Sequence, residues 1–293
     1  MSILCLGEAL VDLVCERPVR SLTEADAFVP HFGGATANVA VNAARRGASV
    51  SLFGGVGDDP WGHWLRSALE REGVGTEHFR LRPGGTTPLA FVTVDEQGEP
   101  AYAFYGDPFG AAAAEAAADL EAAVSAASGL LFASNTLVGG AEREATLRAR
   151  ERALALDLDV WFDPNLRLER WASADEAVEV ARACVPGSRV VKANRAEAEL
   201  LTGETDPGRA AEALAAAGAR LVVVTLGAKG AVVRGEATAD VPGVPARPVS
   251  TVGAGDAFFG VLLARLEPDG PEAALHAAVE TAARVTERWG AIA

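Results

Sequence analysis

Short β-branched or apolar runs alternate with alanine-rich stretches along most of this 293-residue chain. The apolar runs have the length of strands that are buried on both faces, and the alanine-rich stretches have the length of helices. Repeated units of this kind place helices on both faces of a mostly parallel sheet. The alternation therefore predicts an α/β protein with a mostly parallel central sheet flanked by helices.

The boundaries of these elements follow from the same pattern. The predicted strands are 3–7, 49–54, 129–133, 159–163, 189–192 and 221–225. The predicted helices are 36–46, 60–72, 112–127, 141–156, 174–184, 194–202, 207–217, 254–267 and 271–288. The helix at 254–267 is apolar nearly all round, so we expect it to be buried.

Residues 88–105 break this rhythm. Two runs of β-branched and aromatic residues flank the polar turn 95–99, which predicts a β-hairpin. With strand-like pieces near 10–15 and 27–32, the hairpin would form a small antiparallel sheet. We expect such a sheet to act as a lid over the carboxyl edge of the parallel strands, where it would exclude water from a site.

Composition limits the partners of the chain. A hydrophobic content of 49% is ample for a large core, and we expect one main domain over 1–293. The formal net charge of −14, from 40 acidic and 26 basic residues, argues against nucleic acid and against an anionic membrane surface as partners. An anionic cosubstrate would need a local positive site or a magnesium ion.

The cysteines and histidines show no metal-binding or disulfide pattern. Cys5, Cys15 and Cys184 are odd in number and widely spaced, which fits a reducing cytoplasm. The four histidines have no metal-ligand spacing, so structural roles are expected for them. No stretch is long and apolar enough to span a bilayer.

A glycine-rich turn near the C-terminus carries the first chemical signal. In the run from Ser250 to Gly260, Gly253, Ala254 and Gly255 precede Asp256 at the start of the apolar helix. The free N–H groups of a helix start can bind a phosphate, and a carboxylate there can accept a proton from an attacking hydroxyl. The alternative is an aspartate that only caps the helix.

A second glycine-rich stretch leads into the first long helix. Gly33 and Gly34 permit close approach of the backbone, and Asn38 lies one helical turn further on. Asp12 follows the first strand. A carboxylate and an amide at a glycine-lined edge suit a polyol, whose hydroxyls need acceptors and donors. A helix turn and a solvated aspartate are the alternative.

Two further signals lie downstream. Asn194 and Glu197 share one face of a helix start, where they could hold water around magnesium, or where they could form a capping pair. The turn from Thr225 to Gly230 follows a strand and suits the backbone binding of a nucleotide. A plain β-turn is the alternative.

Taken in order, these blocks resemble the ribokinase-like (PfkB-type) carbohydrate kinases over essentially the whole chain. The blocks are Gly33 to Asn38, Gly54 to Asp59, Asn194 to Glu197, Thr225 to Gly227, and Gly253 to Asp256. Within the family the chain is most similar to bacterial fructokinases. The stretches that carry this similarity are Gly7 to Asp12, the hairpin from Thr87 to Tyr105, and Phe162 to Arg167.

The resemblance implies an ATP-dependent kinase that phosphorylates a hydroxyl of a monosaccharide, with fructose the expected substrate. Asp256 would be the catalytic base, and the amides of Gly253, Ala254 and Gly255 would form an anion hole. The implied sugar-binding residues are Asp12, Gly33, Gly34, Asn38, Phe104 and Arg167. The implied nucleotide-binding residues are Lys192, Asn194, Thr225, Gly227 and Gly230. Asn194 and Glu197 would place magnesium through water. The lid would comprise roughly 11–32 and 87–106, and a homodimer would form through it.

Two positions depart from the family. Most relatives carry aspartate where this chain has Ser250, beside a monovalent-cation site, so potassium activation is not expected. Fructokinases tend to carry arginine where this chain has Gly106, followed by Asp107, which leaves 2-keto-3-deoxygluconate, ribose or a nucleoside as alternative substrates. A sugar-binding protein without catalysis is a further alternative, although the intact Gly253, Gly255 and Asp256 argue against it.

Two other classes of nucleotide-binding enzyme do not fit. The turn after the first strand has no GxGxxG motif, which argues against a Rossmann oxidoreductase. No GxxxxGK[ST] motif occurs, which argues against a P-loop kinase.

Overall fold

The computed structural model describes residues 2–106 and 110–292, and these fall into two compact units. The first unit comprises Met1–Leu6 and Ala113–Gly243, and the second comprises Gly7–Ala112 and Val244–Ala293. The single kinase domain expected over 1–293 stays a prediction. Asp107, one of the positions that depart from the family, lies outside the described residues.

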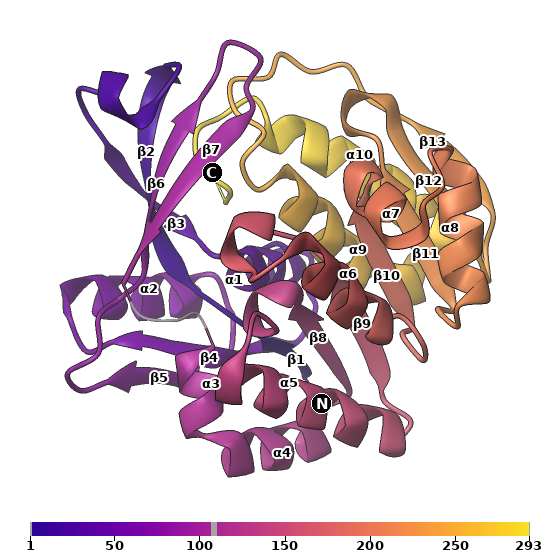
Figure 1. Ribbon diagram of the computed structural model, residues 1–293, viewed down its shortest axis with the longest axis horizontal. Coiled ribbons are helices and arrows are strands. Elements are labelled where there is room, and N and C mark those ends of the chain that lie inside the picture. Colours follow the sequence, from indigo (N-terminus) through magenta and orange to yellow (C-terminus); the bar gives the residue numbers. More distant parts are fainter. Residues whose placement is uncertain (1, 107–109, 293) are drawn as a thin grey trace. The chain divides into compact units, whose positions relative to one another are not determined.

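A large, mostly parallel sheet forms the centre of the first unit (Figure 1). In the described part of this unit the strand order is β13-β12-β11-β10-β9-β8-β1. Neighbouring strands from β1 to β11 run parallel, and β12 and β13 run antiparallel. The strands are β1 (Ile3–Leu6), β8 (Gly129–Ala133), β9 (Asp159–Asp163), β10 (Val190–Asn194), β11 (Leu221–Thr225), β12 (Gly230–Gly235) and β13 (Ala239–Pro242). The predicted α/β class is confirmed.

The strands of this unit are apolar because both faces are covered. Val190 and Val191 of β10 and Val222, Val223 and Val224 of β11 are all fully buried. Such strands read as continuous valine and leucine runs and not as alternating ones. The helices are α3 (Ala111–Glu115), α4 (Ala117–Ala126), α5 (Gly140–Ala155), α6 (Ala174–Ala183), α7 (Arg195–Thr202) and α8 (Pro207–Ala216).

Two predictions of elements need correction. The helix predicted over 112–127 is interrupted at Ala116, whose backbone (φ −119°, ψ 33°) is not helical, so α3 and α4 are separate helices. Strands β12 and β13 were not predicted. Glycine begins and ends β12, and β13 is only four residues long and ends at Pro242, so neither has a strong strand pattern.

The second unit contains the expected small sheet, with strand order β3-β2-β6-β7 (Figure 1). The strands are β2 (Leu10–Pro18), β3 (Val29–Gly33), β6 (Leu89–Val94) and β7 (Pro100–Tyr105). The β2–β3 and β6–β7 pairs are antiparallel, and the predicted hairpin is confirmed. The central β2–β6 pair is parallel, a detail that the sequence pattern does not reveal.

The remaining elements of the second unit surround a buried helix. They are β4 (Val50–Gly57), which pairs in parallel with β5 (Phe79–Arg82), and the helices α1 (Ala35–Ala44), α2 (Pro60–Arg71), α9 (Ala254–Asp269) and α10 (Pro271–Val285). Helix α9 is buried as predicted. At Gly260 a Cβ atom would lie 2.5 Å from the Val39 carbonyl oxygen of α1, so glycine lets the two helices meet at close range. This approach brings the first turn of α9 next to Asn38.

The cysteines are free and buried in the described residues. Burial raises the pKa of Cys5 to about 12 and that of Cys184 to about 11, so both thiols stay protonated at neutral pH. None of the helices in residues 2–106 and 110–292 has the length and hydropathy needed to cross a membrane.

Candidate active site

The glycine turn before α9 has a backbone that requires glycine. Gly253 is the N-cap residue with a left-handed φ of 76°, and a Cβ there would lie 2.2 Å from the Ala291 Cβ. The first bond of the helix runs from the Ala257 N–H to the Gly253 oxygen, at 2.8 Å. Asp256 thus lies inside the first turn and does not cap the helix. The capping alternative for this carboxylate is wrong.

Asp256 instead binds the side chain of Asn38. The Asn38 Nδ2 donates to Asp256 Oδ2 at 2.9 Å, which fixes the orientation of the carboxylate. Asn38 is only 3% exposed, and its other amide atom, Oδ1, is buried with no hydrogen-bond partner among the described residues. A buried acceptor without a donor is costly, so this oxygen is suited to a ligand hydroxyl. The sequence-predicted base and one predicted sugar residue therefore lie together.

The backbone amides at this turn are only partly committed. The Ala254 N–H donates to the Thr251 oxygen at 3.2 Å, which closes a turn just before the helix. The amides of Gly255 and Asp256 come before the first intrahelical bond and point along the helix start, where the macrodipole is positive. In this conformation an anion would meet the Gly255 amide more readily than that of Ala254.

Asp12 and the predicted glycines also lie together. A Cβ on Gly33 would fall 2.3 Å from Asp12 Oδ2, so the carboxylate of Asp12, itself 5% exposed, occupies the space above this glycine. Gly34 caps α1 with a φ of 101°, and a Cβ there would fall 2.5 Å from the Glu8 oxygen. Substitution of Gly33 would displace the Asp12 carboxylate, and substitution of Gly34 would displace the start of α1.

Glu8 is a residue of this region that sequence reasoning missed. Its buried carboxylate accepts a bond from the Ala35 N–H at 2.9 Å, and Thr36 Oγ1 lies 3.5 Å away. Glu8 therefore takes the capping role at α1, where Gly34 has no side chain. An acidic residue directly after a predicted strand was the available signal.

Phe104 lies in the core of the small sheet. Its ring stacks on Tyr102 at 5.6 Å and packs against a cluster of buried apolar residues from several elements. The cluster contains Leu10, Val14, Ala90, Val92, Val252 and Ala291. Packing in the sheet accounts for this aromatic residue, and its predicted contact with sugar stays a prediction.

In the first unit, Asn194 and Glu197 form the capping pair. The Asn194 side chain accepts from the Glu197 N–H at 2.9 Å, and Glu197 Oε2 accepts from the Asn194 N–H at 2.8 Å. Glu197 Oε1 accepts from the Leu166 N–H at 2.9 Å. Glu197 thus ties the segment that leads to Arg167, a predicted sugar-binding residue, to the start of α7.

Lys192 is committed to a buried ion pair. Its Nζ lies 2.9 Å from Asp163 Oδ2, and both side chains are under 10% exposed. Burial raises the pKa of the neighbouring Glu197 carboxyl, and repulsion from Asp163 raises it further. These contacts give Lys192 a structural role as the counter-charge of two acids, and its predicted contact with the nucleotide stays a prediction.

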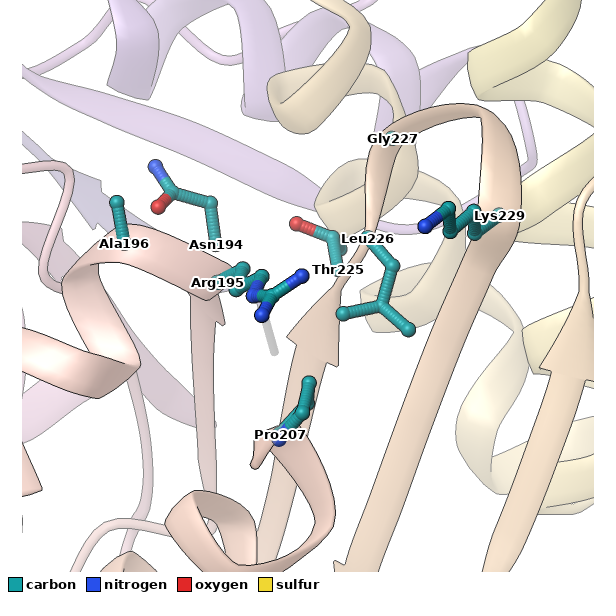
Figure 2. A pocket seen from close by; sticks show the side chains of 8 residues that line it. All are labelled: Asn194, Arg195, Ala196, Pro207, Thr225, Leu226, Gly227 and Lys229. Atoms are coloured by element: carbon teal, nitrogen blue, oxygen red, sulfur yellow. The ribbon is translucent and has the colours of Figure 1, made fainter. Parts of the chain in front are cut away.

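A cavity of about 460 Å³ opens at the ends of β10 and β11 (Figure 2). Its lining residues are Asn194, Arg195, Ala196, Pro207, Thr225, Leu226, Gly227 and Lys229. Three predicted nucleotide residues, Asn194, Thr225 and Gly227, are therefore brought together. Gly230, also a predicted nucleotide residue, is required by the local backbone. Its φ is 98°, and a Cβ at this position would lie 1.9 Å from the Val241 oxygen of β13.

Two cations at this cavity were not predicted. Figure 2 shows Arg195 and Lys229 on different sides of Thr225 and Leu226. Both are exposed, and neither makes a hydrogen bond through its side chain or an ion pair within the described residues. They supply the local positive charge that an anionic cosubstrate needs in an acidic protein. The predicted need for such charge was the available signal.

No group of three or more histidine, cysteine, aspartate or glutamate side chains within residues 2–106 and 110–292 is placed to hold a metal ion. At the predicted magnesium position, both carboxylate oxygens of Glu197 already accept backbone N–H bonds. The residues present fit magnesium only through its bound water, which this ion readily retains when it enters with phosphate groups.

Comparison with known proteins gives the family of this chain. The model of the pfkB family of carbohydrate kinases matches residues 1–293. The fructokinase of Vibrio alginolyticus is 37% identical over 263 residues, which are 89% of this chain and 82% of that protein.

Two solved structures extend the comparison to the fold. One is the fructokinase of Vibrio cholerae O395 with fructose, ADP and calcium bound. It matches with a TM-score of 0.82 and 34% identity, and the match covers 100% of this chain and 95% of the fructokinase chain. A PfkB protein from Polaromonas sp. JS666 has a TM-score of 0.82 and 31% identity over 98% of this chain and 95% of its own. The fold is therefore ribokinase-like, and the chain belongs to the pfkB family of carbohydrate kinases.

Proposed function

We propose that this carbohydrate kinase transfers the γ-phosphoryl group of ATP to a hydroxyl of fructose, with Asp256 as the base. The observation that carries the proposal is the bond between Asn38 and Asp256 at the start of α9. It shows a carboxylate that is held by a side chain and not used as a cap, directly behind a turn that only glycine can form.

The proposed sugar-binding residues described here belong to the second unit. Asp12, buried above Gly33, would accept bonds from sugar hydroxyls, and the unpartnered Oδ1 of Asn38 would accept another. Carboxylate and amide groups fixed in this way select a polyol because each buried polar atom needs a partner. The fixed backbone of Gly34 would complete the contact surface.

The chemical step follows from the position of Asp256. Its carboxylate would take the proton of the attacking hydroxyl as the oxygen forms a bond to the γ-phosphorus and the bond to the β-phosphate oxygen breaks. The amides at the start of α9, those of Gly253 and Gly255 in particular, would stabilise the charge on the transferring group. ADP and the sugar phosphate are the products.

The proposed nucleotide site is the cavity of the first unit. Thr225 and Gly227 would lie along the phosphates, and Asn194 stands at the rim of the same cavity. Arg195 and Lys229 would offset the phosphate charge. A magnesium ion that enters with ATP would neutralise phosphate charge, and Asn194 and Glu197 would hold its water.

Fructose is favoured because two of the three relatives reported above are named fructokinases and the structure of one of them holds fructose. ATP is favoured because that structure also holds ADP, the product expected from ATP. Because Gly106 stands where fructokinases tend to carry arginine, the test also includes 2-keto-3-deoxygluconate, ribose and a nucleoside. A homodimer through the small sheet, in which Tyr105 is 57% exposed, belongs to the same proposal.

The test is a panel of acceptors with ATP and magnesium, read as ADP release. The panel holds fructose, ribose, 2-keto-3-deoxygluconate and adenosine, and fructose is expected to give the highest kcat/KM. Asp256→Asn is expected to keep sugar binding, measured by calorimetry, and to lower kcat by at least about 100-fold, the scale of a lost general base. A better acceptor than fructose would reassign the substrate. Near wild-type turnover in the variant would remove Asp256 as base.

A further inference from the structure

The small sheet is bonded directly to the segment that enters the catalytic turn. Thr251, two residues before Gly253, donates twice to one carbonyl oxygen, that of Gly98: its N–H at 2.9 Å and its Oγ1 at 3.1 Å. Gly98 is buried and lies in the turn between β6 and β7. Glu99 Oε2 lies 3.4 Å from the same hydroxyl. The tip of the hairpin is therefore held on Thr251 and not free.

Thr251 also bonds to the turn itself. Its carbonyl oxygen accepts the Ala254 N–H at 3.2 Å. The N–H and the hydroxyl of Thr251 thus bind the hairpin, while its carbonyl oxygen binds the start of the helix. A movement of Gly98 would be passed through a single peptide to the amides that begin α9.

Packing gives a second and independent connection. Val252, the next residue, is 4% exposed and belongs to the apolar cluster of the small sheet, together with Val14 and Val92. Ala291 of the same cluster is the residue against which Gly253 abuts, and it is fully buried. The turn therefore packs, through Val252 and Ala291, on the same apolar cluster as the strands of the small sheet. Close-packed contacts of this kind transmit displacement because they leave no room for slack.

We propose that Thr251 is a positioning residue for phosphoryl transfer. Because it is bonded to Gly98 at the tip of the hairpin, it fixes the position of the backbone amides in the Gly253 to Gly255 turn. The proposal rests on the catalytic role proposed above for this turn. Stabilisation of a transition state demands donors within a small fraction of an ångström of the developing charge, whereas sugar binding depends on Asp12 and Asn38. Loss of the Thr251 hydroxyl should therefore lower kcat and leave sugar affinity unchanged.

The test compares three variants under saturating ATP and magnesium. Thr251→Val removes the hydroxyl and keeps the shape of the side chain, and Thr251→Ser keeps the hydroxyl. Thr281→Val is the matched control, because the Thr281 hydroxyl also donates to a backbone carbonyl, that of Ala277 at 2.8 Å, but on α10. Thermal unfolding of each variant measures the cost in stability.

We expect Thr251→Val to lower kcat about five- to tenfold, the effect of one lost hydrogen bond on a fixed geometry, with the KM for sugar unchanged. Thr251→Ser is expected to restore kcat, and Thr281→Val to lose similar stability without loss of kcat. A Thr251→Val enzyme with wild-type kcat, or one whose loss is only in KM, would overturn the proposal.

The same series separates this proposal from the proposed function. If Asp256→Asn is inactive and Thr251→Val is fully active, the base stands and the positioning role falls. If Asp256→Asn retains wild-type kcat, the assignment of the base falls, and the kcat of Thr251→Val then decides separately whether the amides of the turn take part in phosphoryl transfer.

Discussion

At the residue scale, Ser250 places a neutral side chain just before the turn to which catalysis is assigned above. Its side chain is 1% exposed, and its Oγ accepts the Val252 N–H at 3.2 Å, so a neutral hydroxyl caps the segment before the catalytic turn. Where relatives carry a carboxylate, that residue adds a negative charge that can hold a monovalent cation. The bond to Val252 does not need the charge.

We therefore predict that turnover depends little on potassium. The rate in potassium chloride should exceed that in tetramethylammonium chloride by less than about twofold, because no buried carboxylate at position 250 favours the ion. The Ser250→Asp variant is the comparison, and it should gain a potassium response. A strong stimulation of the wild-type enzyme would show that backbone oxygens alone hold the cation.

At the residue level, the sequence predicted pairings better than roles. Asp256 and Asn38 were expected in one site and are bonded. Lys192 was expected at the nucleotide, and its ammonium forms an ion pair with Asp163. Asp163 lies at the end of the neighbouring strand β9, and spacing along the chain does not show that the two side chains are adjacent. The cations Arg195 and Lys229 were missed because exposed basic residues on a helix start and in a turn look like ordinary surface.

Among the elements, the start of α2 joins the main body of the second unit to the first strand of the hairpin. Asp59 caps α2 through the Gly62 N–H at 2.9 Å and also accepts from the Thr87 Oγ1 at 2.7 Å and the Thr87 N–H at 2.9 Å. Burial alone would raise the pKa of Asp59, but these bonds hold it below its ordinary value of 3.8. The charged form is therefore stabilised by folding.

We predict that Asp59→Asn lowers the free energy of unfolding by about 1 kcal/mol at pH 7, the usual value of a cap. A carboxyl with a lowered pKa stabilises the fold above its unfolded pKa of 3.8, and this contribution is lost as pH falls through the lower folded pKa. The difference in the free energy of unfolding between the variant and the wild type should therefore become smaller as the pH falls. Urea unfolding from pH 7 to pH 3 measures it.

Asp58→Asn is the matched control for this prediction. The side chain of Asp58 is exposed and in the described residues bonds only to the exposed His63, so its replacement should change stability by less than about 0.5 kcal/mol. Equal losses in the two variants would mean that the Thr87 contacts do not stabilise the fold.

The elements that the sequence predicted are those with strong local patterns. Buried parallel strands such as β11 and amphipathic helices such as α6 follow directly from periodicity. The parallel pairing of β2 with β6 could not be predicted, because the two strands are far apart in the sequence and a long connection allows either pairing direction. Strand β5 alternates apolar and basic residues but is only four residues long, too short for this alternation to predict a strand.

For the whole molecule, the chain order hides the division into units. The first six residues belong to the first unit, yet the next hundred belong to the second, and the chain returns to the second unit after Gly243. The proposed sugar residues other than Arg167 fall in the second unit and the proposed nucleotide residues in the first. Sequence motifs gave the order of these residues but not this partition, which depends on contacts between distant segments.

The net charge of −14 acts on every anionic ligand of the molecule, and the two cations at the cavity act against it locally. At low ionic strength the field of the whole protein extends well beyond the cavity, while at about 0.15 M salt it is screened beyond roughly 8 Å. We predict that Arg195→Gln combined with Lys229→Gln raises the KM for ATP several-fold at low salt, and that added salt then lowers it.

A KM for ATP that falls with salt only in the cavity variant would separate local binding from the field of the whole protein. In the wild-type enzyme, attraction at the cavity and repulsion by the whole molecule oppose each other, so the KM for ATP should change little with salt. The control is Arg66→Gln with Arg148→Gln, which changes the net charge equally through exposed arginines outside the cavity lining. If the control raises the KM as much as the cavity variant, the whole-molecule field dominates ATP binding, and Arg195 and Lys229 have no special part in it.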